Sequence, residues 1–137
     1  MTEFKSQICT TVEQSNRLLG LGLKPETADM CWIPLNDGRC VLGVSTEIRL
    51  DTIPAWSLHR LIEIMPRCIK CRNGFDYADL YVNYDLVQYR FYDTDYMHDV
   101  CYEHFNDGDV YSNVIDCIEW LIKEGKLNKE LREAMED

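Results

Sequence analysis

Positive charge is scarce in this sequence, which has 14 Lys and Arg residues against 24 Asp and Glu and a formal net charge of −10. Proteins that bind nucleic acids or anionic membranes do so with Lys and Arg side chains that neutralise phosphate groups. We therefore expect no direct binding of nucleic acid and no membrane partner. Long apolar runs are also absent, since the longest fall far below the ~20 residues that a membrane-spanning helix needs.

The lack of a signal peptide and the odd number of cysteines indicate the cellular compartment. The first 14 residues lack the basic segment and the following apolar segment of a signal peptide. The seven cysteines are odd in number, and four of them lie in apolar patterns, where cysteine behaves as a small buried hydrophobe. A reducing cytoplasm, without disulfides, is the expected location.

Motifs of known enzymes are missing as well. The chain has no Ser/His/Asp order, no nucleophile elbow and no phosphate-binding glycine loop, since Gly20-Leu21-Gly22 lacks a third glycine and a preceding strand. Carboxylates assisted by His98 or His104 are an alternative, but general acid–base catalysis needs a desolvated group, which a dense run of exposed acids does not provide. We expect a protein that is not an enzyme and that holds no cofactor.

What the sequence does contain is an acidic, tyrosine-rich segment, residues 76–119. It holds eleven Asp and Glu and all eight tyrosines but a single base, Arg90, so it accounts for the whole net charge. Such a segment is typical of a surface that meets a basic protein, and tyrosine supplies contact area at small entropic cost. The residues predicted to bind are Asp93, Asp95, Asp99, Tyr81, Tyr84, Tyr89 and Tyr92. The alternative is that tyrosines on a strand pair simply cover one face of a sheet.

Thiol and imidazole groups in the same region offer a metal site. A C-x-x-C motif is followed by H-x-x-C-x-x-H, which makes Cys68, Cys71, His98, Cys101 and His104 candidate zinc ligands. The spacing of the second motif is unusual for a zinc finger. The C-x-x-C follows the end of a predicted helix, whereas redox motifs precede one, so a thioredoxin-like role is not expected.

Clustered carboxylates could also attract a calcium ion. Asp93, Asp95 and Asp99 form one cluster and Asp107-Gly108-Asp109 another. The first lacks the glycine and the terminal glutamate of a calcium loop. The second is explained more simply as a turn in which Asp109 caps a helix.

Hydrophobic periodicity predicts one α+β domain over residues 1–137, in the order helix, hairpin, helix, hairpin, helix. The hairpins pair residues 30–33 with 40–44 and residues 80–84 with 87–92. The first helix begins with a capping box of Thr10 and Glu13 and ends at Gly20-Leu21-Gly22. The second opens at Pro54 and buries Leu58, Leu61, Ile62 and Met65, with Trp56 as a core anchor.

The third helix follows Asp109 and ends at Gly125, with Leu127 as the hydrophobic contact of its C-terminal cap. Its apolar face holds Val110, Val114, Ile118, Leu121 and Ile122. Trp120 is expected in the core, and Asn128 is expected to cap a short final helix.

Three segments carry a resemblance to a known family. They are Thr11-Val12-Glu13-Gln14-Ser15 with Leu18-Leu19 and residues 22–30, then Ile53-Pro54-Ala55-Trp56-Ser57-Leu58 with Leu61 and Met65-Pro66, and Ile118-Glu119-Trp120-Leu121-Ile122 with Gly125-Lys126-Leu127. Together they resemble a family of small uncharacterised phage and prophage proteins from gut bacteria, and the resemblance covers most of the chain. It implies a mobile-element origin and a cytoplasmic setting. It implies no reaction and no catalytic residue.

Three hypotheses follow. In the first, the chain is a non-enzymatic accessory protein that binds a basic protein through the acidic, tyrosine-rich segment, with a homo-oligomer as a further option. In the second, evenly spaced carboxylates on one continuous surface imitate DNA and inhibit a nucleic-acid-binding protein. In the third, the cysteines and histidines build a zinc module or a metal-dependent enzyme.

Overall fold

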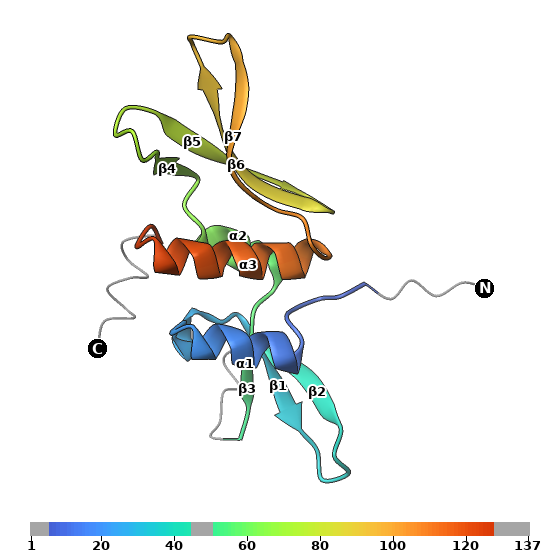
Figure 1. The fold of residues 1–137 in the computed structure, drawn as a ribbon. Coiled ribbons are helices and arrows are strands. Elements are labelled where there is room, and N and C mark those ends of the chain that lie inside the picture. Colours follow the sequence, from blue (N-terminus) through green and yellow to red (C-terminus); the bar gives the residue numbers. More distant parts are fainter. Residues whose placement is uncertain (1–5, 45–50, 128–137) are drawn as a thin grey trace, which may run out of the picture. The chain divides into compact units, whose positions relative to one another are not determined.

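The computed structural model describes residues 6–44 and 51–127. Contacts within the chain divide it into two compact units, Met1–Ile62 (unit 1) and Glu63–Glu136 (unit 2). The described residues form three α-helices and two small antiparallel sheets, so the predicted α+β class is confirmed (Figure 1). That the whole chain is one domain stays a prediction, and each unit is described by itself below.

Unit 1 contains helix α1 (Val12–Gly20), a 3-10 turn (Pro25–Thr27) and a three-stranded sheet in the order β2-β1-β3. The predicted hairpin is present as β1 (Met30–Pro34) and β2 (Cys40–Val44). Strand β3 (Ile53–Ala55) was not predicted, because Pro54 was assigned to the start of a helix. Pro54 occurs in β3 without conflict because β3 is an edge strand of this sheet.

The predicted cap of α1 was wrong by one residue. Thr11, not Thr10, is the N-cap, and its capping box partner is Gln14, whose side-chain amide oxygen accepts from the Thr11 N–H. Thr10 is buried, and its hydroxyl accepts from the Trp56 backbone N–H at 3.0 Å. Thr11 therefore caps the helix, whereas Thr10 binds the backbone at Trp56 in the core.

Helix α2 (Leu58–Ile64) is shorter than predicted and begins after Ser57. The Ser57 hydroxyl accepts from the Arg60 N–H, while the Asp29 carboxylate accepts from the Ser57 backbone N–H at 2.8 Å. Leu61, Met65 and Trp56 are buried as predicted. Leu58 and Ile62 were predicted to be buried but are only half-buried, and Ile64, which was not named, is fully buried.

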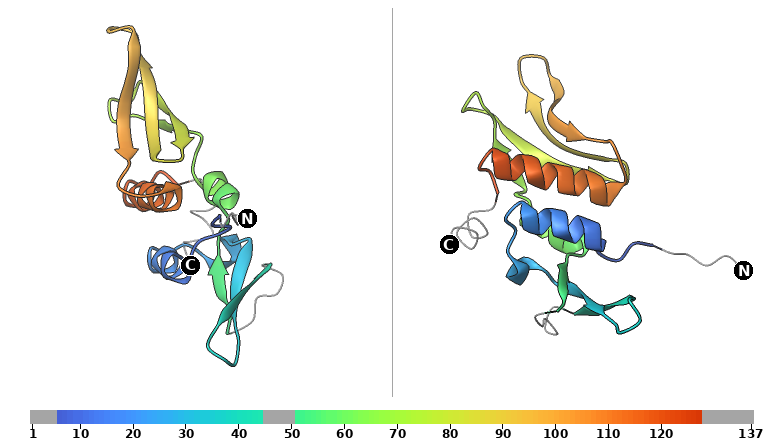
Figure 2. Two further views of the ribbon diagram at one scale, coloured as in Figure 1. Left: turned by 90° about the vertical axis from the view of Figure 1, so that its right-hand side faces the viewer. Right: turned by 60° about the horizontal axis from the view of Figure 1, so that its bottom comes forward.

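Unit 2 contains a four-stranded antiparallel sheet in the chain order β4-β5-β6-β7 and helix α3 (Val110–Lys123). Strands β5 (Tyr77–Asn83) and β6 (Leu86–Asp93) are the predicted hairpin. Strands β4 (Cys68–Lys70) and β7 (His98–Phe105) were not predicted. A register shift at Tyr89/Arg90 marks an irregularity between β6 and β7, and Figure 2 shows that the far end of this hairpin extends away from α3.

Helix α3 has the ends that the sequence predicts. The Asp109 side chain caps its first turn by accepting from the Ser112 N–H at 2.9 Å. Gly125 lies in the left-handed region with φ 67°, and hydrogen bonds from Gly125 to Ile122 and from Lys126 to Leu121 complete a Schellman ending, after which Leu127 is buried. The final helix predicted at Asn128 lies outside the described residues.

The predicted apolar face of α3 is largely correct. Val114, Ile118 and Leu121 are fully buried, whereas Val110 and Ile122 are half-buried. Ile115 and Cys117 are also fully buried, so the helix buries a broader face than was predicted. Trp120 lies about 6 Å from each of three sheet rings, those of Tyr89, Tyr102 and Phe105, and it joins the helix to β6 and β7.

Candidate functional site

The two faces of the β4–β7 sheet have different environments. Side chains alternate along a strand, so Val87 and Tyr89 on β6 point to the face that α3 covers, and both are fully buried. Arg90 and Tyr92 point to the opposite face, which we call the outer face. Tyr92 is 53% exposed there. This alternation decides which predicted residues can meet a partner.

Tyr89 was predicted to bind a partner, and the structure corrects this assignment. Its side chain is fully buried, and its hydroxyl donates a hydrogen bond to the carbonyl oxygen of Pro66 at 2.7 Å. Burial raises the pKa of Tyr89 well above its usual value, because the phenolate would be desolvated. Tyr89 is therefore part of the core, as the alternative reading of the tyrosines had allowed.

Four of the predicted residues come together at the far end of the β6–β7 hairpin. Tyr92 pairs with Asp99 and Asp93 pairs with His98, while Asp95 lies in the turn between the strands. We call residues 92–99 the hairpin tip. Tyr96 and Met97, which were not among the predicted binding residues, are 73% and 76% exposed in this turn. The tip therefore presents two aromatic rings and a thioether to solvent beside three carboxylates.

The turn at the tip has a defined conformation. The Asp93 carboxylate accepts from the backbone N–H groups of Asp95 and Tyr96 at 2.9 and 3.3 Å, and the Met97 N–H donates to the Asp93 carbonyl at 2.7 Å. Met97 has φ 57°, in the left-handed region that costs roughly 1–2 kcal/mol for a residue with a side chain. The sequence keeps a large apolar side chain where a glycine would fit with less strain.

Charge around the tip is almost entirely negative. Residues 91–122 contain no Lys or Arg. The nearest base in the sequence is Arg90, whose guanidinium lies 4.1 Å from the Tyr81 ring centroid and pairs with Asp99 at 3.2 Å. Asp99 is thus partly neutralised, whereas Asp95 contributes its backbone N–H to the turn.

The two remaining predicted tyrosines lie elsewhere. Tyr81, 42% exposed, is on the outer face beneath Arg90, and Tyr84, 83% exposed, is in the turn between β5 and β6. That turn is at the opposite end of β6 from the tip, about 23 Å away for an eight-residue strand. The predicted residues therefore do not form one site.

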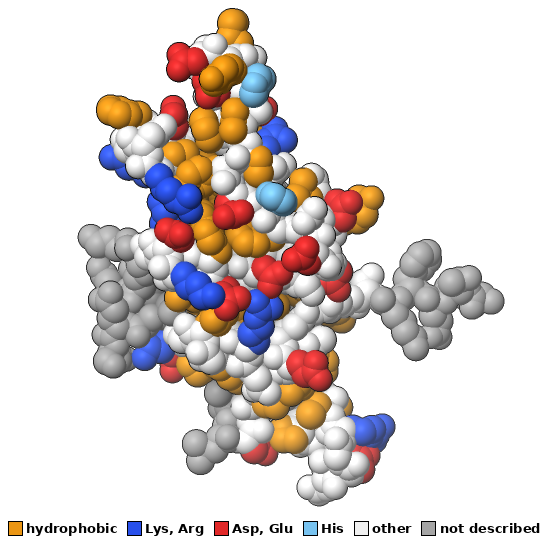
Figure 3. All heavy atoms as spheres, in the orientation of Figure 1, with side chains coloured by type: hydrophobic (Ala, Val, Ile, Leu, Met, Phe, Trp, Pro, Cys, Tyr) orange, Lys and Arg blue, Asp and Glu red, His pale blue; other side chains and the backbone are white. Residues whose placement is uncertain are grey.

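The eleven acids of residues 76–119 are also divided. Asp79 and Asp99 lie on the outer face, Asp76, Asp85 and Asp95 lie in or beside turns, and Asp116 and Glu119 lie on α3, which covers the other face. Within unit 2, Figure 3 shows carboxylates in several separate places on the visible side. Mimicry of DNA requires one continuous acidic surface, so this division gives it no specific support.

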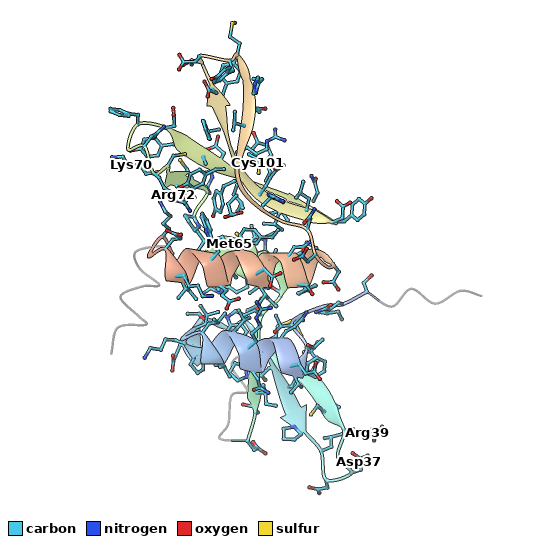
Figure 4. The ribbon with its side chains drawn as sticks, in the orientation of Figure 1. Asp37, Arg39, Met65, Lys70, Arg72 and Cys101 are labelled. Atoms are coloured by element: carbon cyan, nitrogen blue, oxygen red, sulfur yellow. The ribbon has the colours of Figure 1, made fainter. Side chains whose placement is uncertain are left out.

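The zinc candidates are separated by the sheet. Cys68 lies on β4 and Cys101 on β7, with β5 and β6 between them, and Figure 4 shows Cys101 away from the β4 residue Lys70. Cys68 is exposed and Cys71 is buried, since an odd offset along an extended segment turns side chains to opposite sides. His98 and His104 lie at opposite ends of β7. The five candidates are therefore not brought together.

The thiols also lack the electrostatics of reactive or metal-binding cysteines. Although both side chains are exposed, partial desolvation of the sulfur, followed by the neighbouring Asp79, raises the pKa of Cys68, and partial desolvation followed by Glu103 raises the pKa of Cys101. A raised pKa keeps a thiol protonated, whereas the thiolate is the nucleophile and ligand. Among residues 6–44 and 51–127, no group of three or more His, Cys, Asp or Glu is placed to hold a metal ion.

The calcium candidates have structural roles instead. Asp93 holds the hairpin turn, and Asp109 caps α3. The side chain of Asn113 bridges the backbone N–H and carbonyl of Gly108 at 3.0 and 2.9 Å, which fixes the turn before the helix. These hydrogen bonds give the carboxylates of Asp93 and Asp109 structural roles.

In the part of the chain that the structure describes, no helix is long and apolar enough to cross a membrane. A scan against protein-family models and searches of curated proteins and of solved structures found no match to this chain. The family resemblance of the three sequence segments therefore stays a prediction.

Proposed function

We propose that this chain is a non-enzymatic accessory protein of phage or prophage type that acts in the cytoplasm by binding a basic protein. Its contact surface is the hairpin tip, residues 92–99. The observation that carries the proposal is the exposure of Tyr96 and Met97, at 73% and 76%, beside Asp93, Asp95 and Asp99.

Three physical properties of the tip support this function. Exposed apolar side chains cost solvation free energy in the free protein, and their burial against a partner recovers it. The hydrogen bonds of Asp93 hold the turn in one conformation, so little conformational entropy remains to be lost on binding. The carboxylates, which lie in a stretch of sequence without Lys or Arg from residue 91 to residue 122, favour a partner with a basic rim and accelerate its association.

The proposal is tested by affinity capture from an extract of a bacterial host, with three versions of the protein. They are the natural sequence, the tip variant Tyr96→Ser/Met97→Gly, and the control Tyr84→Ser, which removes a similarly exposed tyrosine at the other end of β6. We expect the natural protein and the control to retain the same basic protein at low salt. The tip variant should retain at least about tenfold less of that protein, which corresponds to a loss of about 1.4 kcal/mol or more of binding free energy.

Salt separates the two components of binding. Screening should weaken capture by the natural protein at high salt without abolishing it, because the apolar contact of Tyr96 and Met97 is not screened. Equal capture by the tip variant and the natural protein would refute the assignment of the tip as the contact surface.

A further inference from the structure

The outer face of the β4–β7 sheet carries two rows of side chains, of which the first is continuous across all four strands. The strand register aligns one residue from each strand in this first row, in the order Cys68, Asp79, Arg90, Cys101. The second row, two residues along each strand, consists of the separate pairs Lys70–Tyr77 and Tyr92–Asp99, because the pairing of β5 with β6 ends at Asp79 and Arg90. Cys68 and Cys101 are exposed, and Tyr77 and Tyr92 are 57% and 53% exposed.

These rows are balanced in charge. Each contains one acid and one base, in contrast to the acidic excess of residues 76–119 as a whole. A strongly one-signed face repels a copy of itself, whereas a balanced face can be complementary to itself. Within the first row, Arg90 is held by Tyr81 and Asp99, and its Nε is buried with no hydrogen-bond partner.

A twofold rotation can place the first row of one copy against the same row of a second copy, with the order of the residues reversed. A twofold axis parallel to the strands, between β5 and β6, places β5 of one copy over β6 of the other and β4 over β7. Arg90 then faces the second copy's Asp79, and Cys68 faces its Cys101. The first row is thus complementary to itself under this axis.

The inner face and the β7 edge of this sheet are less suited to association. Helix α3 covers the inner face. At the β7 edge, the His104 N–H donates to the Glu103 carboxylate at 3.1 Å, and the His98 ring nitrogen Nδ1 lies 3.0 Å from the Asp99 carbonyl oxygen. Backbone groups that bond to side chains are not free to pair with another strand, and the register shift distorts the edge further.

We propose that the outer face of β4–β7 binds a second copy of this chain, face to face, about a twofold axis between β5 and β6. Packed sheets lie ~10 Å apart with their strands within about 30° of each other, which suits this arrangement. The interface shares Tyr92 and Asp99 with the contact surface of the proposed function but does not include Tyr96 or Met97. Asp79 and Arg90, at its centre, lie two strand residues away from the tip.

The first test exchanges charge at the centre of the interface. We expect the natural protein to show a monomer–dimer equilibrium in sedimentation velocity over about 1 µM to 1 mM. Asp79→Arg and Arg90→Asp should each weaken dimerisation at least about tenfold, because like charges then face each other. An equimolar mixture of the two variants should restore dimers, since every contact then joins opposite charges.

A control and a second readout keep the test decisive. Asp85→Arg makes the same charge change in the β5–β6 turn and should leave dimerisation unchanged. A short bismaleimide that spans ~10 Å should link Cys68 to the second copy's Cys101 in a Cys40→Ser background. Cys68→Ser and Cys101→Ser should each abolish the crosslink, and a mixture of those two variants should restore it. Because these thiols need no charge change, this readout stays valid even if Arg90→Asp fails to fold.

A natural protein that sediments as a monomer throughout the concentration range would overturn the proposal. So would variants that dimerise normally, or mixtures that restore neither the dimer nor the crosslink. The Tyr96→Ser/Met97→Gly variant should dimerise normally, so failure here and failure of the proposed function give different results.

Discussion

The hydroxyl of Tyr89 donates a hydrogen bond to the carbonyl oxygen of Pro66 at 2.7 Å. This contact ties the centre of β6 to the segment that follows α2. Both groups would otherwise be polar atoms without a partner in the interior, where an unsatisfied carbonyl costs roughly 1–3 kcal/mol.

Tyr89→Phe should therefore lower the free energy of unfolding by about 1–3 kcal/mol, since it removes the donor and leaves the Pro66 carbonyl unsatisfied. Tyr92→Phe, on the exposed outer face, is the matched control and should change it by less than about 0.5 kcal/mol. Urea unfolding of both variants measures the difference. Equal stability of the two would mean that the Tyr89 hydroxyl is accessible to water.

Leu61→Ala should lower the free energy of unfolding by about 2–5 kcal/mol, because Leu61 is fully buried and its truncation leaves a cavity. Ile62→Ala, at the next position, should lower the free energy of unfolding by less, because Ile62 is only half-buried. Chemical denaturation of the pair checks the order. A larger loss for Ile62→Ala would reverse the assigned buried face of α2.

Cys117 makes stability depend on pH in the alkaline range. Burial, followed by Glu103 and Asp116, raises the pKa of Cys117 to about 12 from the ordinary thiol value. The unfolded state loses this proton first, so the contribution is fully present below about pH 8.5 and is lost progressively above it. Cys117→Ala should reduce the slope of stability against pH above pH 9 by up to about 1.4 kcal/mol per pH unit. Urea titrations between pH 8 and 10.5 measure it, and an unchanged slope would contradict the burial of this thiol.

Met97→Gly should raise the stability of the isolated protein by about 0.5–1 kcal/mol, because glycine adopts the positive φ of the turn with less strain. Met97→Asn is the control that tolerates this conformation while keeping a side chain. Thermal unfolding compares the three proteins. A less stable Met97→Gly variant would show that the methionine side chain packs within the fold.

Much of the fold could be predicted because local signals and tertiary packing agree. Asp109, Gly125 and Leu127 mark the ends of α3, and their predicted roles are confirmed. The β5–β6 hairpin follows from the alternation of side chains within residues 80–84 and 87–92. In these elements, the secondary structure that each residue favours locally agrees with the side on which the fold buries it.

The missed strands show where the local signal fails. The apolar residues of β7 lie at Val100, Tyr102 and Phe105, so the period of two is broken near the register shift. Strand β4 has three residues, too few for periodicity, and β3 contains Pro54, which resembles a helix start. Without β7 the hairpin turn could not be recognised, so Tyr96 and Met97 were missed. A sequence signal was present in Asp93, which is typical of a turn and follows a predicted strand.

The binding residues could be predicted only in part, because sequence proximity does not specify a face. Tyr89 and Tyr92 are three residues apart on one strand, and an odd spacing turns one into the core and the other to solvent. Composition identified the acidic region, whereas the register determines which acids share a surface.

The most direct test of the account is site-specific photo-crosslinking at the tip. A photoreactive phenylalanine analogue replaces Tyr96 in one protein and Tyr84 in a second, since both tyrosines are highly exposed turn residues of the same sheet. After irradiation in a bacterial host extract, position 96 should give a discrete adduct with a basic protein, and Asp95→Asn in the same protein should weaken it. Position 84 should give no such adduct. Adducts of equal yield at both positions, or none at position 96, would contradict the claim that the hairpin tip is the contact surface.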